Sequence, residues 1–104
     1  MTLTRMALEA KADLIERIAL SIETDSPNDA AACADAVYAL TVAGVYSIDI
    51  AREAQVAVST VTRWGQGVRG PNPLMRPRVV AALIRAARAT VVALRGPAAE
   101  QIAA

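Results

Sequence analysis

The sequence predicts an all-α protein, a compact bundle of about five helices with a long helix at each end. Hydrophobic residues make up 55% of the 104 residues and aromatic residues only 3%, because much of the apolar content is alanine. Alanine favours helix. No run of residues alternates between apolar and polar with the two-residue period of a strand. The length fits a single domain over residues 1–104, large enough for a core of its own.

A long N-terminal helix is predicted over residues 3–23. Its apolar side chains form one broad stripe at 3.6 residues per turn: Leu3, Ala7, Leu8, Leu14, Ile15, Ile18 and Ile22. On the polar face, Asp13 and Arg17 have a spacing that favours an ion pair. Met6 and Leu20 lie off the stripe. They are either ordinary exposed side chains or part of a second contact surface, such as a dimer interface.

The second helix is expected over residues 30–43. Ser26 is a good N-cap, Pro27 suits a first helical position, and Asp29 favours the positive end of the helix. Gly44 fits the C-terminal stop. Cys33 is the only cysteine and is expected to be a small core residue.

Two short helices separated by a tight turn are predicted over residues 47–66. The first covers about 48–55, with Ser47 as its cap, and the second covers 58–66. Apolar side chains sit where the two helices must pack on each other and on a core: Ile50, Ala51, Ala54, Val56, Val61 and Trp64. This spacing predicts a helix-turn-helix.

The last helix is predicted over residues 73–95, after a glycine- and proline-rich connector, and Gly96 and Pro97 end it. Its expected core face consists of Val80, Leu83, Ile84, Ala87, Val91 and Leu94. The arginines are expected on the opposite face: Arg78, Arg85, Arg88 and Arg95.

Charge is distributed unevenly along the chain. Residues 1–50 carry three basic and eight acidic side chains, whereas residues 51–104 carry eight basic and two acidic ones, and no acid lies between residues 54 and 99. A basic half around the helix-turn-helix is the pattern that binds a polyanion. The alternative is that these arginines are solvated on polar helix faces.

The second short helix would enter the major groove of DNA and offer donors and acceptors to base edges. The expected base contacts are Val58, Ser59, Thr60, Thr62 and Arg63. The expected phosphate contacts, which position a protein without recognising sequence, are Arg52, Gln66 and Arg69.

The segment 56–64, Val-Ala-Val-Ser-Thr-Val-Thr-Arg-Trp, resembles the recognition segment of Cro/lambda-repressor-type (XRE-like) regulators of phages and prophages. The connector 65–71 and the apolar helix after it add to the resemblance, which covers roughly residues 45–83. The resemblance implies a repressor or activator that binds operator DNA, usually as a homodimer. Two positions depart from the family pattern. Gln55 stands where glycine is common, and its left-handed conformation would cost ~1 kcal/mol. Ala57 stands where a capping serine is common.

An enzyme is not expected. The chain has no histidine, so the usual acid–base group at neutral pH is missing and nothing activates Cys33. The Gly65-Gln66-Gly67 segment lacks the lysine motif of a phosphate-binding loop. We therefore expect no catalytic residues, no cofactor and no metal. The remaining alternative is a protein-binding adaptor, such as an antitoxin or anti-activator, that could also repress its own operon.

A cytoplasmic location, on the nucleoid through DNA binding, is expected. A single cysteine forms no intramolecular disulfide and suits a reducing compartment. The longest uncharged run, between Asp35 and Asp49, is shorter than the ~20 apolar residues that cross a bilayer. Glu9, Asp13 and Glu16 within the first helix argue against a signal peptide.

Overall fold

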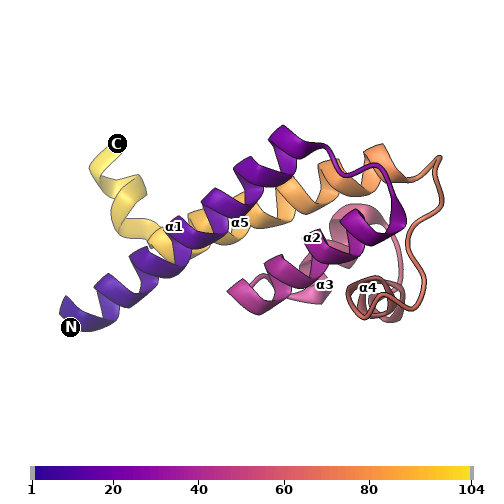
Figure 1. Cartoon of the computed structure of the whole chain (residues 1–104). Coiled ribbons are helices and arrows are strands. Elements are labelled where there is room, and N and C mark those ends of the chain that lie inside the picture. Colours follow the sequence, from indigo (N-terminus) through magenta and orange to yellow (C-terminus); the bar gives the residue numbers. More distant parts are fainter. Residues whose placement is uncertain (1, 104) are drawn as a thin grey trace.

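The computed structural model describes the backbone of residues 2–103 and the side chains of residues 4–96. Over residues 2–103 the chain forms five α-helices and no strand: α1 (Thr2–Asp25), α2 (Ala30–Ala43), α3 (Ser47–Ala54), α4 (Val58–Gly65) and α5 (Arg76–Ala103). The long helices α1 and α5 lie side by side, and the shorter helices α2, α3 and α4 pack together along one side of this pair (Figure 1). The predicted all-α fold with two long terminal helices is confirmed.

The buried face of α1 differs from the predicted stripe. Its fully buried side chains are Ala12, Ile15, Ala19 and Ile22, with Ile18 partly buried. Leu8 and Leu14 remain 40% and 42% exposed. Ala7 is also exposed, and the side chain of Leu3 lies outside the described residues. We expected the leucines to be buried because leucine is more hydrophobic than alanine. Instead, the small side chains of Ala12 and Ala19 line the contact, and small side chains let helix axes approach closely.

The start of α2 also differs from the prediction. Asp29, not Ser26, is the N-cap, and its carboxylate accepts a hydrogen bond of 2.8 Å from the Ala32 N–H. Ser26 instead ends α1, because it adopts a positive φ of 46° and its N–H donates to the Ile22 carbonyl. Gly44 ends α2 as predicted, at φ 118°. Cys33 is fully buried, which confirms it as a core residue.

The helix α5 starts three residues later than predicted, and its regular helical backbone breaks at Gly96 (φ 75°, ψ 179°) before continuing to Ala103. The predicted core face is confirmed, with Ile84 and Leu94 only partly buried. Three further side chains are buried that the prediction missed: Val79, Ala82 and Ala86. Because α5 contacts α1, α2 and α3, its buried face is wider than a single stripe.

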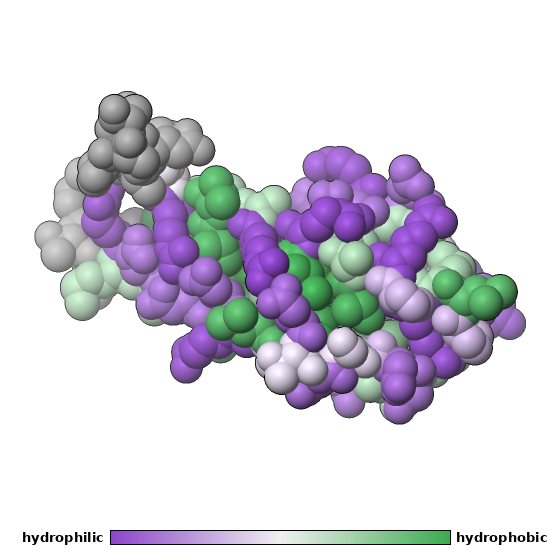
Figure 2. All heavy atoms as spheres, turned by 90° about the horizontal axis from the view of Figure 1, so that it is seen from above, coloured by the Kyte–Doolittle hydropathy of each residue, from purple (hydrophilic) through white to green (hydrophobic). Residues whose placement is uncertain are grey.

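Three arginines of α5 bind acids on other helices instead of facing solvent alone. Arg95 reaches Glu9 (3.6 Å), Asp13 (3.0 Å) and Glu16 (2.9 Å) of α1. Hydrogen bonds to Glu16 and Asp13 raise the pKa of Arg95 above its ordinary value. The predicted Asp13–Arg17 pair is therefore replaced by a contact between helices. Figure 2, a view onto the upper side of Figure 1, shows polar side chains crossing patches of apolar surface.

The other two arginines are Arg88 and Arg85. Arg88 pairs with Glu23 of α1 at 3.2 Å, and Arg85 pairs with Glu53 of α3 at 3.5 Å. The four acids Glu9, Asp13, Glu16 and Glu23 thus lie along α1 where the basic helix α5 can meet them. The charge asymmetry of the sequence is partly neutralised by this packing.

Candidate nucleic-acid interface

The turn between α3 and α4 is a left-handed C-cap followed by a short extended segment. Gln55 has φ 59° and ψ 45°, and its N–H donates to the Ala51 and Arg52 carbonyls. The Val56 N–H also donates to the Ala51 carbonyl, at 3.0 Å. This confirms the prediction that residue 55 needs a positive φ although it is not glycine. Ala57 is the N-cap of α4 and offers no side-chain hydrogen bond, as its sequence position also indicated.

The N-terminus of α3 differs from the prediction. Tyr46 is the N-cap, Ser47 is already helical, and no side chain caps the helix. The Asp49 and Ile50 N–H groups donate to the Tyr46 carbonyl. The helix thus begins one residue earlier than expected, and the Ser47 hydroxyl is not used as a cap.

The helix α4 has one buried and one exposed side. Val61 and Trp64 are buried in the same core cluster as Ile50 and Ala51, and Val56 packs against it. On the other side, Ser59, Thr62 and Arg63 are exposed, as are Val58 and Gln66. Thr60 is half-buried and is the least accessible of the predicted base contacts. The packing predicted for the helix-turn-helix is confirmed.

Not every exposed hydroxyl of α4 is equally able to donate. The Thr62 hydroxyl donates to the Val58 carbonyl of its own helix at 3.1 Å. Its oxygen can still accept a hydrogen bond. Ser59 and Arg63 therefore carry the outward-directed donors of this helix.

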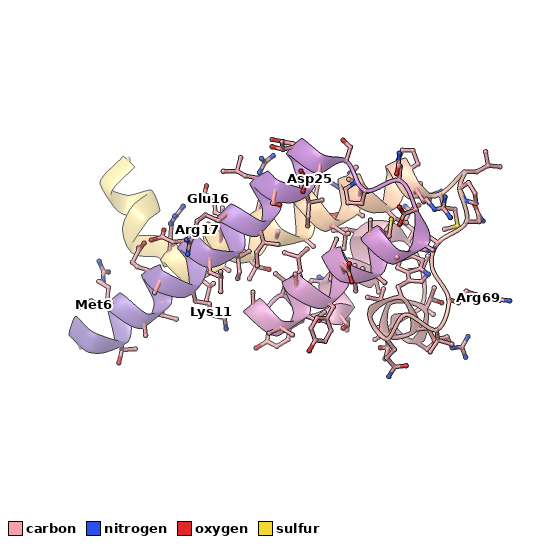
Figure 3. The ribbon with its side chains drawn as sticks, in the orientation of Figure 1. Met6, Lys11, Glu16, Arg17, Asp25 and Arg69 are labelled. Atoms are coloured by element: carbon pink, nitrogen blue, oxygen red, sulfur yellow. The ribbon has the colours of Figure 1, made fainter. Side chains whose placement is uncertain are left out.

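The connector after α4 holds a further cation at the same end of the molecule. Arg69 is exposed and points away from the body of the protein beside α4 (Figure 3). The connector itself is anchored, because Gly70 packs so closely on α2 that a Cβ there would lie 2.6 Å from the Ala30 Cβ. The Val68 N–H also donates to the Arg63 carbonyl. The connector that carries Arg69 is thus held against the C-terminal end of α4.

Arg52 lies apart from this group. It pairs with Asp49 at 3.3 Å, and it lines a groove between α1, α3 and α5 together with Lys11 and Thr90. No residue of α4 lines that groove. Arg52, expected from the sequence as a phosphate contact, therefore stays a prediction, and it lies on another part of the surface than Arg69.

Among the side chains of residues 4–96, seven cations have no acidic partner: four lie on α4, in the connector and at the start of α5, and the other three, Arg5, Lys11 and Arg17, lie on α1. Among the side chains of residues 4–96, ion pairs involve Arg52, Arg85, Arg88 and Arg95, but not Arg63, Arg69, Arg76 or Arg78. Arg78 donates to the Gln55 side chain at 2.7 Å and so lies beside the turn of the helix-turn-helix. The sequence analysis missed this position, because the partner is a neutral amide 23 residues away.

Comparisons with protein-family models, curated proteins and solved structures find no match to the chain. The resemblance to Cro/lambda-repressor-type regulators therefore stays a prediction from residues 45–83. Within the described part of the chain, no group of three or more His, Cys, Asp or Glu side chains could hold a metal ion. No helix searched there has the length and apolar character needed to cross a membrane.

Proposed function

We propose that this protein is a sequence-specific regulator of transcription that binds double-stranded DNA with α4 in the major groove. The observation that carries the proposal is the two-sided character of α4. Val61 and Trp64 hold the helix on the core, while Ser59, Thr62 and Arg63 are left exposed. A helix presented in this way fits a groove about 12 Å wide.

The chemistry of the exposed side suits base edges and phosphates. Arg63 can bind guanine O6 and N7 in a bidentate manner, Ser59 can bond bases or phosphates, and Val58 can pack on a thymine methyl group. Arg69 and Gln66 stand beside the same helix and suit phosphates. Because the arginines near α4 lack acidic partners, their charge is available to a polyanion.

A homodimer is part of the proposal. The eight residues of α4 span about 12 Å, which matches only about four base pairs at 3.4 Å each. Two copies on a two-fold-related site would double the sequence recognised, with half-sites about one helical turn apart.

Binding of the purified protein to a duplex from its own upstream region tests this proposal. We expect Arg63→Ala to weaken binding to the preferred site by about 1–3 kcal/mol and to relax base preference locally. Arg69→Ala should weaken binding to all sequences alike and lower the salt slope by about one. Arg17→Ala, an exposed arginine on α1 far from Arg69 in Figure 3, is the matched control. Specific and random duplexes bound equally by the parent and by Arg63→Ala would contradict the assignment.

A protein-binding adaptor is the second candidate. Met6 and Leu20 on α1 are 62% and 50% exposed, which leaves apolar surface for a partner. Against this candidate, four of the five acids of α1 that would attract a basic partner already bind Arg88 or Arg95. No shift of any DNA fragment at moderate salt, combined with a stable complex with a second protein, would favour the adaptor.

A further inference from the structure

We propose that the hydroxyl groups of Tyr38 and Ser47 bind DNA phosphates on the side of α4 that carries no arginine. The inference rests on the proposed function, because it assumes that α4 enters the major groove. It adds a second, uncharged set of backbone contacts to the cationic set around Arg69.

A groove beside α4 brings these two residues to the proposed interface. Its floor consists of Val37, Val61 and Gly65, and its polar rim consists of Tyr38, Thr41, Ser47, Thr62 and Gln66. Thr62 and Gln66 belong to the exposed side of α4. Tyr38 on α2 and Ser47 on α3 therefore border the surface that would face DNA.

The size of the major groove brings a sugar–phosphate chain close to each side of an inserted helix. An α-helix with its side chains is about 10–12 Å across, and the groove is about 12 Å wide. A helix lying in the groove therefore leaves the sugar–phosphate chains next to whatever borders it on each side. Arg69 lies in the connector that follows α4. The groove with Tyr38 and Ser47 lies between α4 and the helices that precede it.

The polar groups on the rim of this groove are uncharged, yet they can donate hydrogen bonds to an anion. Residues 36–48 contain no charged side chain. Tyr38 is 60% exposed and Ser47 is half-buried. Within residues 4–96, the hydroxyls of Tyr38 and Ser47 take part in no hydrogen bond, whereas Thr41 donates to the Tyr38 carbonyl at 2.9 Å. Two hydroxyl donors thus remain for phosphate oxygens, which commonly accept from serine and tyrosine.

A neutral contact has a signature that a cationic contact lacks. Arginine bound to a phosphate releases counterions, so it contributes to the slope of log K against log [salt]. A hydroxyl donor strengthens binding but neutralises no phosphate, and hence leaves that slope unchanged. Affinity and salt dependence therefore separate the two sides of α4.

The test compares Tyr38→Phe with Tyr46→Phe, each of which removes one hydroxyl group. Tyr46 is the only other tyrosine. It is 69% exposed, and it lines the groove between α1, α3 and α5 rather than the one beside α4. We expect Tyr38→Phe to weaken binding to specific and random duplexes alike by about three- to tenfold, the usual range for one lost hydrogen bond, with an unchanged salt slope. Tyr46→Phe should bind like the parent. Ser47→Ala should weaken binding further when it is combined with Tyr38→Phe.

Three results would overturn the inference, and each is recognisable. Equal affinity of the parent, Tyr38→Phe and Tyr46→Phe would show that the Tyr38 hydroxyl makes no contact. A reduced salt slope in Tyr38→Phe would mean that the hydroxyl acts by positioning a cation. No duplex binding by the parent protein would remove the proposed function itself. In the first two cases, Arg69→Ala still lowers the slope, so the proposed function survives. Unchanged thermal unfolding of Tyr38→Phe shows that the loss is not a folding defect.

Discussion

Replacing Gln55 with glycine and with alanine tests the left-handed turn that joins α3 to α4. At φ 59° and ψ 45°, a residue with a Cβ is strained by roughly 1–2 kcal/mol, whereas glycine is not. Glycine loses about 0.5–1 kcal/mol more backbone entropy on folding. Both variants also remove the 2.7 Å hydrogen bond from Arg78, so that loss cancels when they are compared. We expect the glycine variant to be more stable than the alanine variant by about 0.5–1 kcal/mol.

Thermal unfolding followed by circular dichroism measures this difference. For a domain of this size, it corresponds to roughly 2–4 °C in Tm. Ala81→Gly is the control, since Ala81 is exposed within α5, and glycine inside a helix costs about 1 kcal/mol relative to alanine. The sign should therefore be opposite at positions 55 and 81. An alanine variant at position 55 that is more stable than the glycine variant, as at position 81, would show that the turn is not left-handed there.

Two further predictions concern the core around α2. Gly44→Ala should lower the free energy of unfolding by on the order of 1–2 kcal/mol in urea, because φ is 118°, a conformation that residues with a Cβ rarely adopt, whereas the flexible end of the Lys11 side chain can move away from the new Cβ. Gly67→Ala, at φ 73° with open space around it, should also lose about 1 kcal/mol, and no loss of stability in either variant would contradict the strain assigned to positive φ. Burial raises the pKa of the Cys33 thiol, so the unfolded chain ionises first, and stability should fall as the pH rises past the ordinary thiol pKa of about 8.5. Between pH 7 and pH 9.5, the urea midpoint of unfolding should therefore fall more in the parent than in Cys33→Ala. The same pH dependence in both proteins would contradict a contribution from the Cys33 thiol.

Local signals in the sequence were sufficient to predict the helix-turn-helix. The spacing of Ile50, Val61 and Trp64 indicated which side of each short helix packs inward. The position of Gln55 in the turn indicated a positive φ, because the turn geometry requires it whichever residue is present. These features depend on neighbours within one or two helical turns, so periodicity and turn chemistry are enough to predict them.

The contacts of α1 could not be predicted in the same way. Hydropathy favoured Leu14 over Ala12, but the small side chain lies in the contact with the neighbouring helix. The ion pairs of Arg95 with Asp13 and Glu16 join residues 82 and 79 positions apart. Such pairs depend on how α1 and α5 align, and no local pattern contains that alignment. Because these ion pairs could not be foreseen, the sequence suggested more unpaired positive charge in residues 51–104 than the structure has.

The groove with Tyr38 and Ser47 is a second feature that sequence analysis could not supply. The two residues belong to α2 and α3, and only the packing of both helices beside α4 brings them together. One signal was present, namely the long uncharged run between Asp35 and Asp49. The run alone does not indicate which helices pack beside it.

Protection of guanine N7 from methylation tests most directly whether α4 binds in the major groove, because N7 is exposed only there. On a duplex from the upstream region, the parent protein should protect guanines in two half-sites about 10 base pairs apart. Arg63→Ala should lose protection at the guanine it contacts while other contacts persist, and Arg17→Ala should match the parent. Bound protein that leaves every guanine N7 reactive, or an Arg63→Ala pattern identical to that of the parent at equal occupancy, would contradict the proposed mode of binding.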